Sequence, residues 1–343
     1  MKNCFKIFVF LSLLLAFGNL FSFQPPILLN VNEHLSDSSL VIKYKIENFQ
    51  NGVEAKINIL QKNTKEIPAL NEQKIIGDYG KIEEKENYQF EILINLLPDN
   101  FNFQEYTAFP KIIFQDRIYY EMEKIEKGKY SFYQDDEKKV FEAAKDFYIS
   151  KFEVSNEQFV AFINTDGYEI KEYWLVKKGV MANPEVGWNF QGIFNMSAPM
   201  DWNLNDSPYW KSAPSNFVYG PVTNLRWFEA NAFCNWMGSS LPDLNDISIC
   251  FSFDSVENDS TYNPACLDID KNGEFPLHFI RSNVSEWLIL SVDSNAPPCG
   301  PGCREMFYLM NNSNTPYEFP DKGVSCPLYR NVILGFRYKI LCF

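Results

Sequence analysis

Residues 147–164 read FYISKFEVSNEQFVAFIN and place a strand pattern directly before a helix pattern. FYISKFEV alternates as a β-strand does. SNEQ is a capping box, in which the serine accepts a hydrogen bond from the backbone N–H of Gln158 and the glutamine side chain reaches back. Phe159, Phe162 and Ile163 follow at helical spacing, so we expect a short helix that buries an aromatic face.

A second helix is predicted within PVTNLRWFEANAFCNWMGSSLP, residues 221–242. Gly238 suits the C-terminal cap of that helix because glycine readily adopts a left-handed conformation. The residues just before it, from 199 to 221, are rich in Pro, Asn and Trp, which predicts an irregular segment. One stripe of the helix is expected to face the core and comprises Trp227, Ala230, Cys234 and Met237.

The first part of the chain predicts short strands. SLVIKYKI, NGVEAKINIL and YQFEILINLL each show the period of two that is typical of half-buried strands. The Asn51–Gly52 pair predicts a hairpin between the first two of them. All seven tryptophans lie between Trp174 and Trp287, which indicates two domains. We therefore expect an immunoglobulin-like β-sandwich over residues 23–115 as an accessory domain, and a mixed, loop-rich domain over residues 116–343.

Charge and targeting signals limit the functions that the chain can have. The net charge is -13, which argues against nucleic acid as a partner and against an anionic membrane surface. With only two histidines, His34 and His278, a Ser-His-Asp or multi-histidine site is excluded in practice. Residues 1–22 combine a basic start with an apolar run and predict a signal peptide, so we expect export to the periplasm, the cell surface or the medium. The alternative is an uncleaved membrane anchor.

Eight cysteines are present, and Cys4 lies within the predicted signal peptide. The other seven fall in the last 110 residues, and in an oxidising compartment such a cluster favours disulfides. An odd number leaves at least one thiol unpaired or bonded to another molecule. Those seven are Cys234, Cys250, Cys266, Cys299, Cys303, Cys326 and Cys342.

Four segments resemble, in order, the motifs of the formylglycine-generating enzyme family, which is also called the sulfatase-modifying factor domain family. FYISKFEVSNEQFVAFIN resembles its KYEVTNAQYxxF, and the segment 221–242 resembles its PVxxVSWxDAxAYCxW…LPTEAEWE. SNVSEWL at 282–288 resembles GNVWEW, and RNVILGFRYK at 330–339 resembles the closing GFRxA. The resemblance implies an α+β fold of the C-type-lectin-like kind, and members often carry a β-sandwich in front.

The sequence departs from that family where catalysis would occur. Catalytic members place a copper-binding cysteine pair after an RGGSW-like strand between the last two motifs. Here REMFYLMNNS takes the place of that strand, Cys299 and Cys303 precede it, and Cys326 is the next cysteine. The LPTEAEWE segment has become LPDLNDISI, and serine replaces the first glycine of GNVWEW. The resemblance therefore implies a divergent member without a recognisable catalytic pair.

Two metals are candidates. In CGPGC the thiols of Cys299 and Cys303 suit Cu(I), although a structural pair around a Gly-Pro turn is the simpler interpretation. In LDIDKNGEF the side chains of Asp268, Asp270 and Asn272 match the start of an oxygen-rich calcium loop, but an EF-hand is excluded because Phe279 replaces the final glutamate. The resemblance adds Glu286, since family members bind structural calcium near GNVWEW. The alternative is an acidic turn, with Glu286 hydrogen-bonded to the backbone.

Three functions follow for an exported chain of this kind. The first is a non-catalytic binding or structural module with a degenerate formylglycine-generating-enzyme-like domain, stabilised by calcium and bound to a protein or glycan. The second is a copper-dependent thiol oxidase that uses Cys299, Cys303 and Cys326. The third is a surface carbohydrate binder, in which Trp202 and Trp210 stack on sugar rings; it depends on fold analogy alone.

Overall fold

The structure is a computed structural model that describes residues 24–36, 39–61, 75–85, 88–95, 106–134, 137–177, 180–181, 183–199, 202, 220–251, 285–291, 306–309, 322–325 and 334–342. Within these ranges the fold is mixed and rich in sheet, with four α-helices. No helix in the described parts has the length and apolar character needed to cross a membrane.

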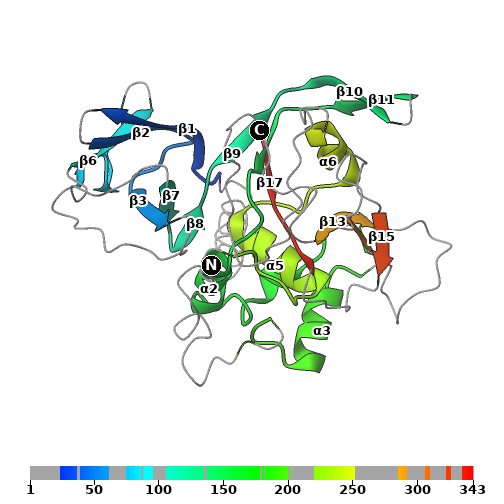
Figure 1. Cartoon of the computed structure of the whole chain (residues 1–343). Coiled ribbons are helices and arrows are strands. Elements are labelled where there is room, and N and C mark those ends of the chain that lie inside the picture. The colour runs from blue at the N-terminus through cyan, green and yellow to red at the C-terminus, as the bar shows by residue number, and fades with distance from the viewer. Residues whose placement is uncertain are drawn as a thin grey trace, which may run out of the picture.

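Two four-stranded antiparallel sheets form the N-terminal part of the fold (Figure 1). Alternate residues of their strands are buried, as the period of two predicts, and both sheets contribute to one apolar core. We call these two sheets the sheet pair. In strand order, the first sheet is β1 (Ile27–Ser36), β2 (Ser39–Glu47), β6 (Gln89–Asn95) and β4 (Ile75–Gly77), and the second is β5 (Gly80–Lys81), β3 (Glu54–Gln61), β7 (Tyr106–Phe114) and β8 (Arg117–Tyr119).

The predicted hairpin at Asn51–Gly52 is wrong. A turn does form there, and Gly52 adopts the positive φ of 95° that favours glycine. The strands on either side of it, β2 and β3, belong to different sheets, so the turn carries the chain from one sheet to the other. The sequence signal is local and describes only the reversal of the chain, whereas the choice of partner strand is made by the packing of the sheets.

The sheet pair is joined closely to the rest of the molecule. Residues 115–116, where a domain boundary is predicted, are the tight turn of the β7–β8 hairpin, so β8 still belongs to the sheet pair. Beyond β8 the apolar core continues without interruption into the helical part. The buried Lys111 of β7 also forms an ion pair with Glu157, whose second oxygen accepts a hydrogen bond of 2.6 Å from Tyr120.

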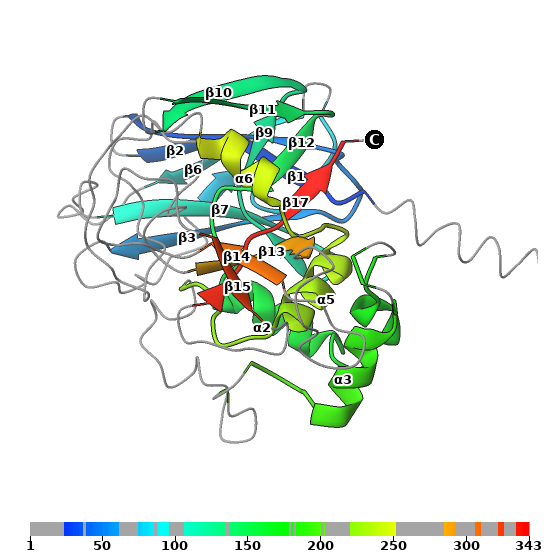
Figure 2. The same ribbon diagram turned by 90° about the vertical axis from the view of Figure 1, so that its right-hand side faces the viewer.

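A three-stranded sheet connects the sheet pair to the chain terminus. It has the strand order β17 (Lys339–Leu341), β12 (Phe147–Ser150) and β9 (Met122–Ile125), all antiparallel. A hairpin of β10 (Gly128–Gln134) and β11 (Glu137–Ala143) covers one side of α6, as Figure 2 shows. The last sheet has the order β15 (Lys322–Ser325), β14 (Met306–Leu309), β13 (Ser285–Ser291) and β16 (Leu334–Gly335).

Helix α2 (Asn156–Asn164) begins at the predicted capping box. The Ser155 hydroxyl accepts from the backbone N–H of Gln158 at 3.2 Å, and Oε1 of Gln158 accepts from the backbone N–H of Ser155 at 3.0 Å. Nε2 of the same glutamine donates to the carbonyl of Ile118 at 2.9 Å, which ties α2 to β8. Phe159 and Phe162 are fully buried, so the predicted aromatic face is confirmed.

Replacing Ser155 with alanine should lower the free energy of unfolding by about 0.5–2 kcal/mol, because a buried helix N-terminus loses its side-chain acceptor. Chemical denaturation of the purified chain measures the change. Ser197→Ala is the matched control, since it makes the same change at an exposed position. Equal losses in the two variants would contradict a stabilising cap.

Every residue of helix α5 (Trp227–Met237) except Asn235 is buried. It ends at Gly238, whose φ of 70° is the left-handed conformation predicted for the cap. The ring of Phe233 stacks on Phe159 of α2 at a centroid distance of 5.5 Å and meets Phe336 edge-on at 5.4 Å. The predicted apolar stripe is confirmed, because all four of its members are buried.

LPDLNDISI, the segment compared above with LPTEAEWE, leads into a capped helix, α6 (Leu244–Phe251). Asp243 and Asp246 accept from each other's backbone N–H groups at 2.8 and 2.7 Å. Lys339 of β17 forms an ion pair with Asp246, which fastens α6 to the three-stranded sheet. Burial raises the pKa of Asp246 to about 6, although Lys339 opposes this shift.

The remaining described helical elements are α3 (Val186–Phe194) and a 3-10 turn, η3 (Lys171–Trp174).

Candidate functional site

A buried ion pair joins three of the family-like segments. Arg337, from the connection between β16 and β17, is 0% exposed, and Glu286 of β13 is 1% exposed. Nε of Arg337 donates to Oε2 of Glu286 at 2.8 Å, and Nη2 donates to Oε1 at 2.6 Å. This two-point geometry is the strongest that an arginine makes with a carboxylate. SNVSEWL and GFRYK therefore meet through their charged residues.

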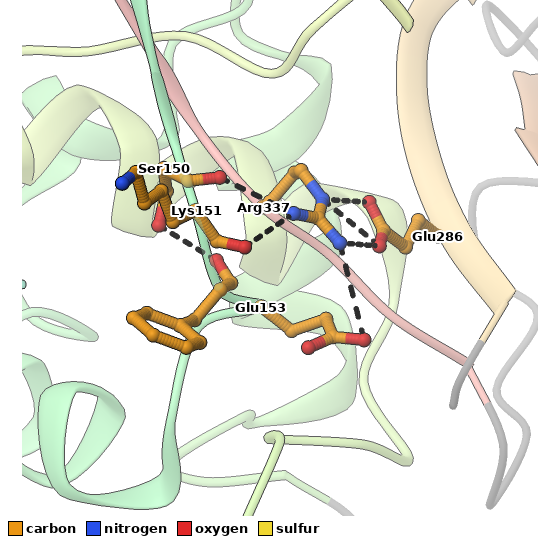
Figure 3. A network of polar contacts seen from close by, with 6 residues as sticks. Ser150, Lys151, Glu153, Glu286 and Arg337 are labelled. Carbon is orange, nitrogen blue, oxygen red and sulfur yellow. Dashed lines mark hydrogen bonds and ion pairs between the residues drawn. The ribbon is translucent and has the colours of Figure 1, made fainter. Parts of the chain in front are cut away.

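The other edge of the guanidinium faces the first segment, FYISKFEV (Figure 3). Nη1 donates to the carbonyls of Ser150 at 3.2 Å and Lys151 at 3.1 Å, and Nη2 lies 4.0 Å from Oε1 of the buried Glu153. Burial would lower the pKa of Arg337, but Glu286 and Glu153 outweigh this effect and raise it above its ordinary value. Arg337 therefore stays charged and neutralises two buried carboxylates.

Two tryptophans connect α5 to β13 in the same region. The indole N–H of Trp227 donates to the carbonyl of Leu288 at 2.8 Å, and that of Trp287 donates to the carbonyl of Leu225 at 3.3 Å. Both indoles are fully buried, and a buried tryptophan usually has such an acceptor. The tryptophan of SNVSEWL and the tryptophan that opens α5 thus hold each other's segments in place.

A buried glutamate in α5 has a similar structural role. Glu229 is 0% exposed, accepts from the backbone N–H of Arg226 at 2.8 Å and accepts from the Tyr168 hydroxyl at 2.7 Å. It caps its own helix and fixes the segment that follows α2. Glu229, Glu286 and Arg337 are therefore buried polar residues that hold segments of the fold together, as in a scaffold.

Most of the predicted site residues lie outside the described residues. These are Cys299, Cys303, Cys326, Asp268, Asp270, Asn272 and Trp210. Glu286 is described, and its side chain binds Arg337. Trp202 is half-buried and meets Phe159 edge-on at 6.2 Å, so part of its ring packs on the core.

Glu286 is the member of the predicted calcium site that lies within the described residues. Both of its oxygens accept from Arg337, so a cation on that carboxylate would face a guanidinium at hydrogen-bond distance. Like charges this close repel strongly in a buried site, and the Glu286 carboxylate in this arrangement does not suit a calcium ion. Across the described stretches, no three His, Cys, Asp or Glu side chains gather as metal ligands would.

Three of the seven cysteines are described, and all three are free thiols. Cys234 and Cys250 are buried, and burial raises the pKa of both thiols. Cys342 is half-exposed. The disulfide prediction therefore rests on the four other cysteines, which lie outside the described residues.

In the native protein, alkylation of Cys234 and Cys250 should be more than about 100-fold slower than that of Cys342, because a buried thiol reacts only after the structure opens. Mass spectrometry of peptides after timed exposure to iodoacetamide measures the three rates. All three should become equal in denaturant. Rapid native labelling of Cys234 or Cys250 would contradict their burial.

The structure reveals two buried charged positions that the sequence did not single out, Arg337 and Glu153. Both carry charges inside apolar motifs, and a charged residue in such a run is the signal that would have found them. Glu286 was expected to bind calcium or backbone, whereas its observed partner, Arg337, lies 51 residues away.

Comparisons with known proteins agree with this scaffold. Residues 115–262 match the sulfatase-modifying factor enzyme 1-like domain. A hercynine oxygenase from Mycolicibacterium thermoresistibile is 27% identical over 100 residues, which are 28% of this chain and 20% of that protein. A formylglycine-generating enzyme from Thermomonospora curvata is 28% identical over an alignment length of 115, and the match covers 28% of this chain and 34% of that protein. The chain thus spans about a fifth and a third of these relatives, and residues 115–262 are similar to a sulfatase-modifying factor enzyme 1-like domain from which they diverge.

Proposed function

We propose that the chain is a non-catalytic binding or structural module that keeps the scaffold of this domain family. The observation that supports this proposal is the network of buried hydrogen bonds and ion pairs around Arg337. Arg337 pairs there with Glu286 and Glu153, so one charged residue from each of three family-like segments takes part, and all three are buried. Selection for the fold alone accounts for such a network, because each member satisfies another's buried charge.

As part of this proposal, the protein is exported by the signal peptide over residues 1–22, and the sheet pair is an immunoglobulin-like accessory domain in front of a C-type-lectin-like fold. Its ligand is a protein or a glycan, and the acidic net charge disfavours nucleic acid. Calcium would bind at Asp268, Asp270 and Asn272 rather than at Glu286, since Arg337 already occupies that carboxylate.

The deciding experiment offers a cysteine-containing sulfatase-type peptide to the pure, copper-loaded protein in air. A non-catalytic module leaves the cysteine unchanged, and mass spectrometry detects its conversion to formylglycine. The Thermomonospora curvata enzyme is the positive control. Conversion by this chain would overturn the proposal.

A copper-dependent thiol oxidase is the second candidate, and it is favoured by the names of the two relatives, an oxygenase and a formylglycine-generating enzyme. Cys299, Cys303 and Cys326 would hold Cu(I), because thiolates suit that soft ion. Stoichiometric Cu(I) binding that disappears in Cys299→Ser or Cys303→Ser would support it. Cys234→Ser is the matched control, since that thiol is buried. Unchanged copper binding in the Cys299 and Cys303 variants would exclude that pair.

A further inference from the structure

Helix α3 exposes an apolar face at the edge of the molecule (Figure 1, Figure 2). Its nine residues, VGWNFQGIF, carry no charge, although 22% of the whole chain is charged. Ile193 is the most exposed large apolar side chain of the described residues, at 71%, and the neighbouring Phe194 is 47% exposed. Adjoining apolar side chains that remain in water mark interaction sites more often than single ones do.

The exposed end of α3 is held in one conformation by its neighbours. The ring of Phe194 stacks on Phe190 at a centroid distance of 6.0 Å, and Phe190 stacks on the buried Phe228 of α5 at 5.5 Å. The guanidinium of Arg226 lies over the Phe194 ring, 4.8 Å from its centroid. A partner therefore meets a preorganised surface, which lowers the entropy that binding costs.

The two ends of α3 carry opposite charges. Glu185, at the N-terminal end, pairs with Lys171, and its side chain is still 53% exposed. Arg226 lies beside Phe194, the last residue of the helix, about 13 Å further along the axis at 1.5 Å per residue. If a second α3 packs antiparallel to the first, the glutamate of each copy approaches the arginine of the other, and the helix dipoles oppose each other favourably. The surface is thus complementary to itself under a two-fold rotation.

We propose that α3 is the contact surface of a homodimer, in which two copies pack their α3 helices antiparallel around a two-fold axis near Asn189. Glu185, Asn189 and Ile193 are spaced four residues apart and line the exposed face. Gly192 is also exposed, and a Cβ added there would meet nothing within 4 Å, so the backbone of the other copy can approach closely. The uncharged contact brings no like charges together, so the net charge of -13 opposes it only at long range. The small apolar surface predicts a weak dimer.

Sedimentation equilibrium of the purified chain measures the dimer, in reducing buffer so that disulfides cannot link the copies. Gly192→Arg should raise the dissociation constant at least about tenfold, because it buries a charge at the contact while the monomer has open space for the side chain. Ile193→Glu should have a similar effect. Gly128→Arg in β10 is the matched control and should leave the dimer unchanged, since a Cβ there makes an ordinary contact of 3.8 Å with Tyr130.

A third variant tests the orientation of the two helices. Glu185→Lys should raise the dissociation constant about threefold or more, because it places a cation opposite Arg226 of the other copy, whereas the loss of an exposed ion pair costs the monomer little stability. A chain that stays monomeric up to about 100 µM, or a dimer that tolerates both Gly192→Arg and Ile193→Glu, would overturn the proposal. Monomers that bind phosphatidylcholine vesicles through these residues would also overturn it, because the face would then belong to a lipid surface.

Discussion

Replacing Arg337 with methionine is expected to lower the free energy of unfolding by about 3–5 kcal/mol, because it leaves Glu286 and Glu153 buried without the positive charge between them. Equilibrium denaturation in urea measures the loss. Lys43→Met is the matched control: it breaks an ion pair of 3.5 Å with Glu91 in which both side chains are about half exposed. Its expected cost is about 0–1 kcal/mol.

Two further variants test whether the loss of stability comes from the two-point contact of Arg337 and from the buried charge that its removal leaves. Arg337→Lys keeps the charge but cannot form the two-point contact with Glu286, so we expect it to recover only part of the loss. Arg337→Met/Glu286→Leu should be more stable than Arg337→Met alone, because it removes a buried charge that the single change strands. A loss below about 1 kcal/mol in Arg337→Met would show that the network contributes little.

The second large effect is expected at Phe233. Its ring packs against the rings of Phe159 and Phe336. The centroid of its ring lies 5.5 Å from that of Trp236, and all four side chains are buried. Phe233→Ala should cost about 3–5 kcal/mol through lost burial and the cavity that it leaves. Thermal and chemical denaturation both measure this loss.

Phe194→Ala provides the control for that change. The Phe194 side chain at the end of α3 is 47% exposed, so the same truncation there creates no closed cavity. We expect a cost several-fold smaller than at Phe233. Similar losses at the two positions would mean that the aromatic cluster is not the centre of stability.

Local signals in the sequence predicted the elements well. The capping box of α2, the apolar stripe of α5 and the glycine that ends it all involve residues within one or two helical turns, and the structure confirms each of them. The alternation in β2 was also correct. These features depend on short-range backbone geometry, which neighbouring residues determine.

What the sequence did not reveal depends on distance along the chain. The Asn51–Gly52 turn connects two sheets rather than two paired strands. Glu286 binds a residue that lies 51 positions away, and no periodicity encodes such a pairing. Of the candidate site residues, Glu286 and Trp202 lie within the described residues and could be placed. The partner of Glu286 could not be predicted, since a buried charge reveals only that it requires a counter-charge.

Arg337 contacts residues that lie far from it in the sequence, and this affects when the molecule can fold. Its guanidinium binds the carbonyl of Ser150, 187 residues earlier, and β17 completes the sheet that begins with β9. Contacts of such separation are slow to form, because a long loop must close before they add any stability. During synthesis Arg337 cannot pair with Glu286 and Glu153 until residue 337 has emerged. A late-arriving residue of this kind delays the closing of the core relative to the synthesis of the segments that precede it.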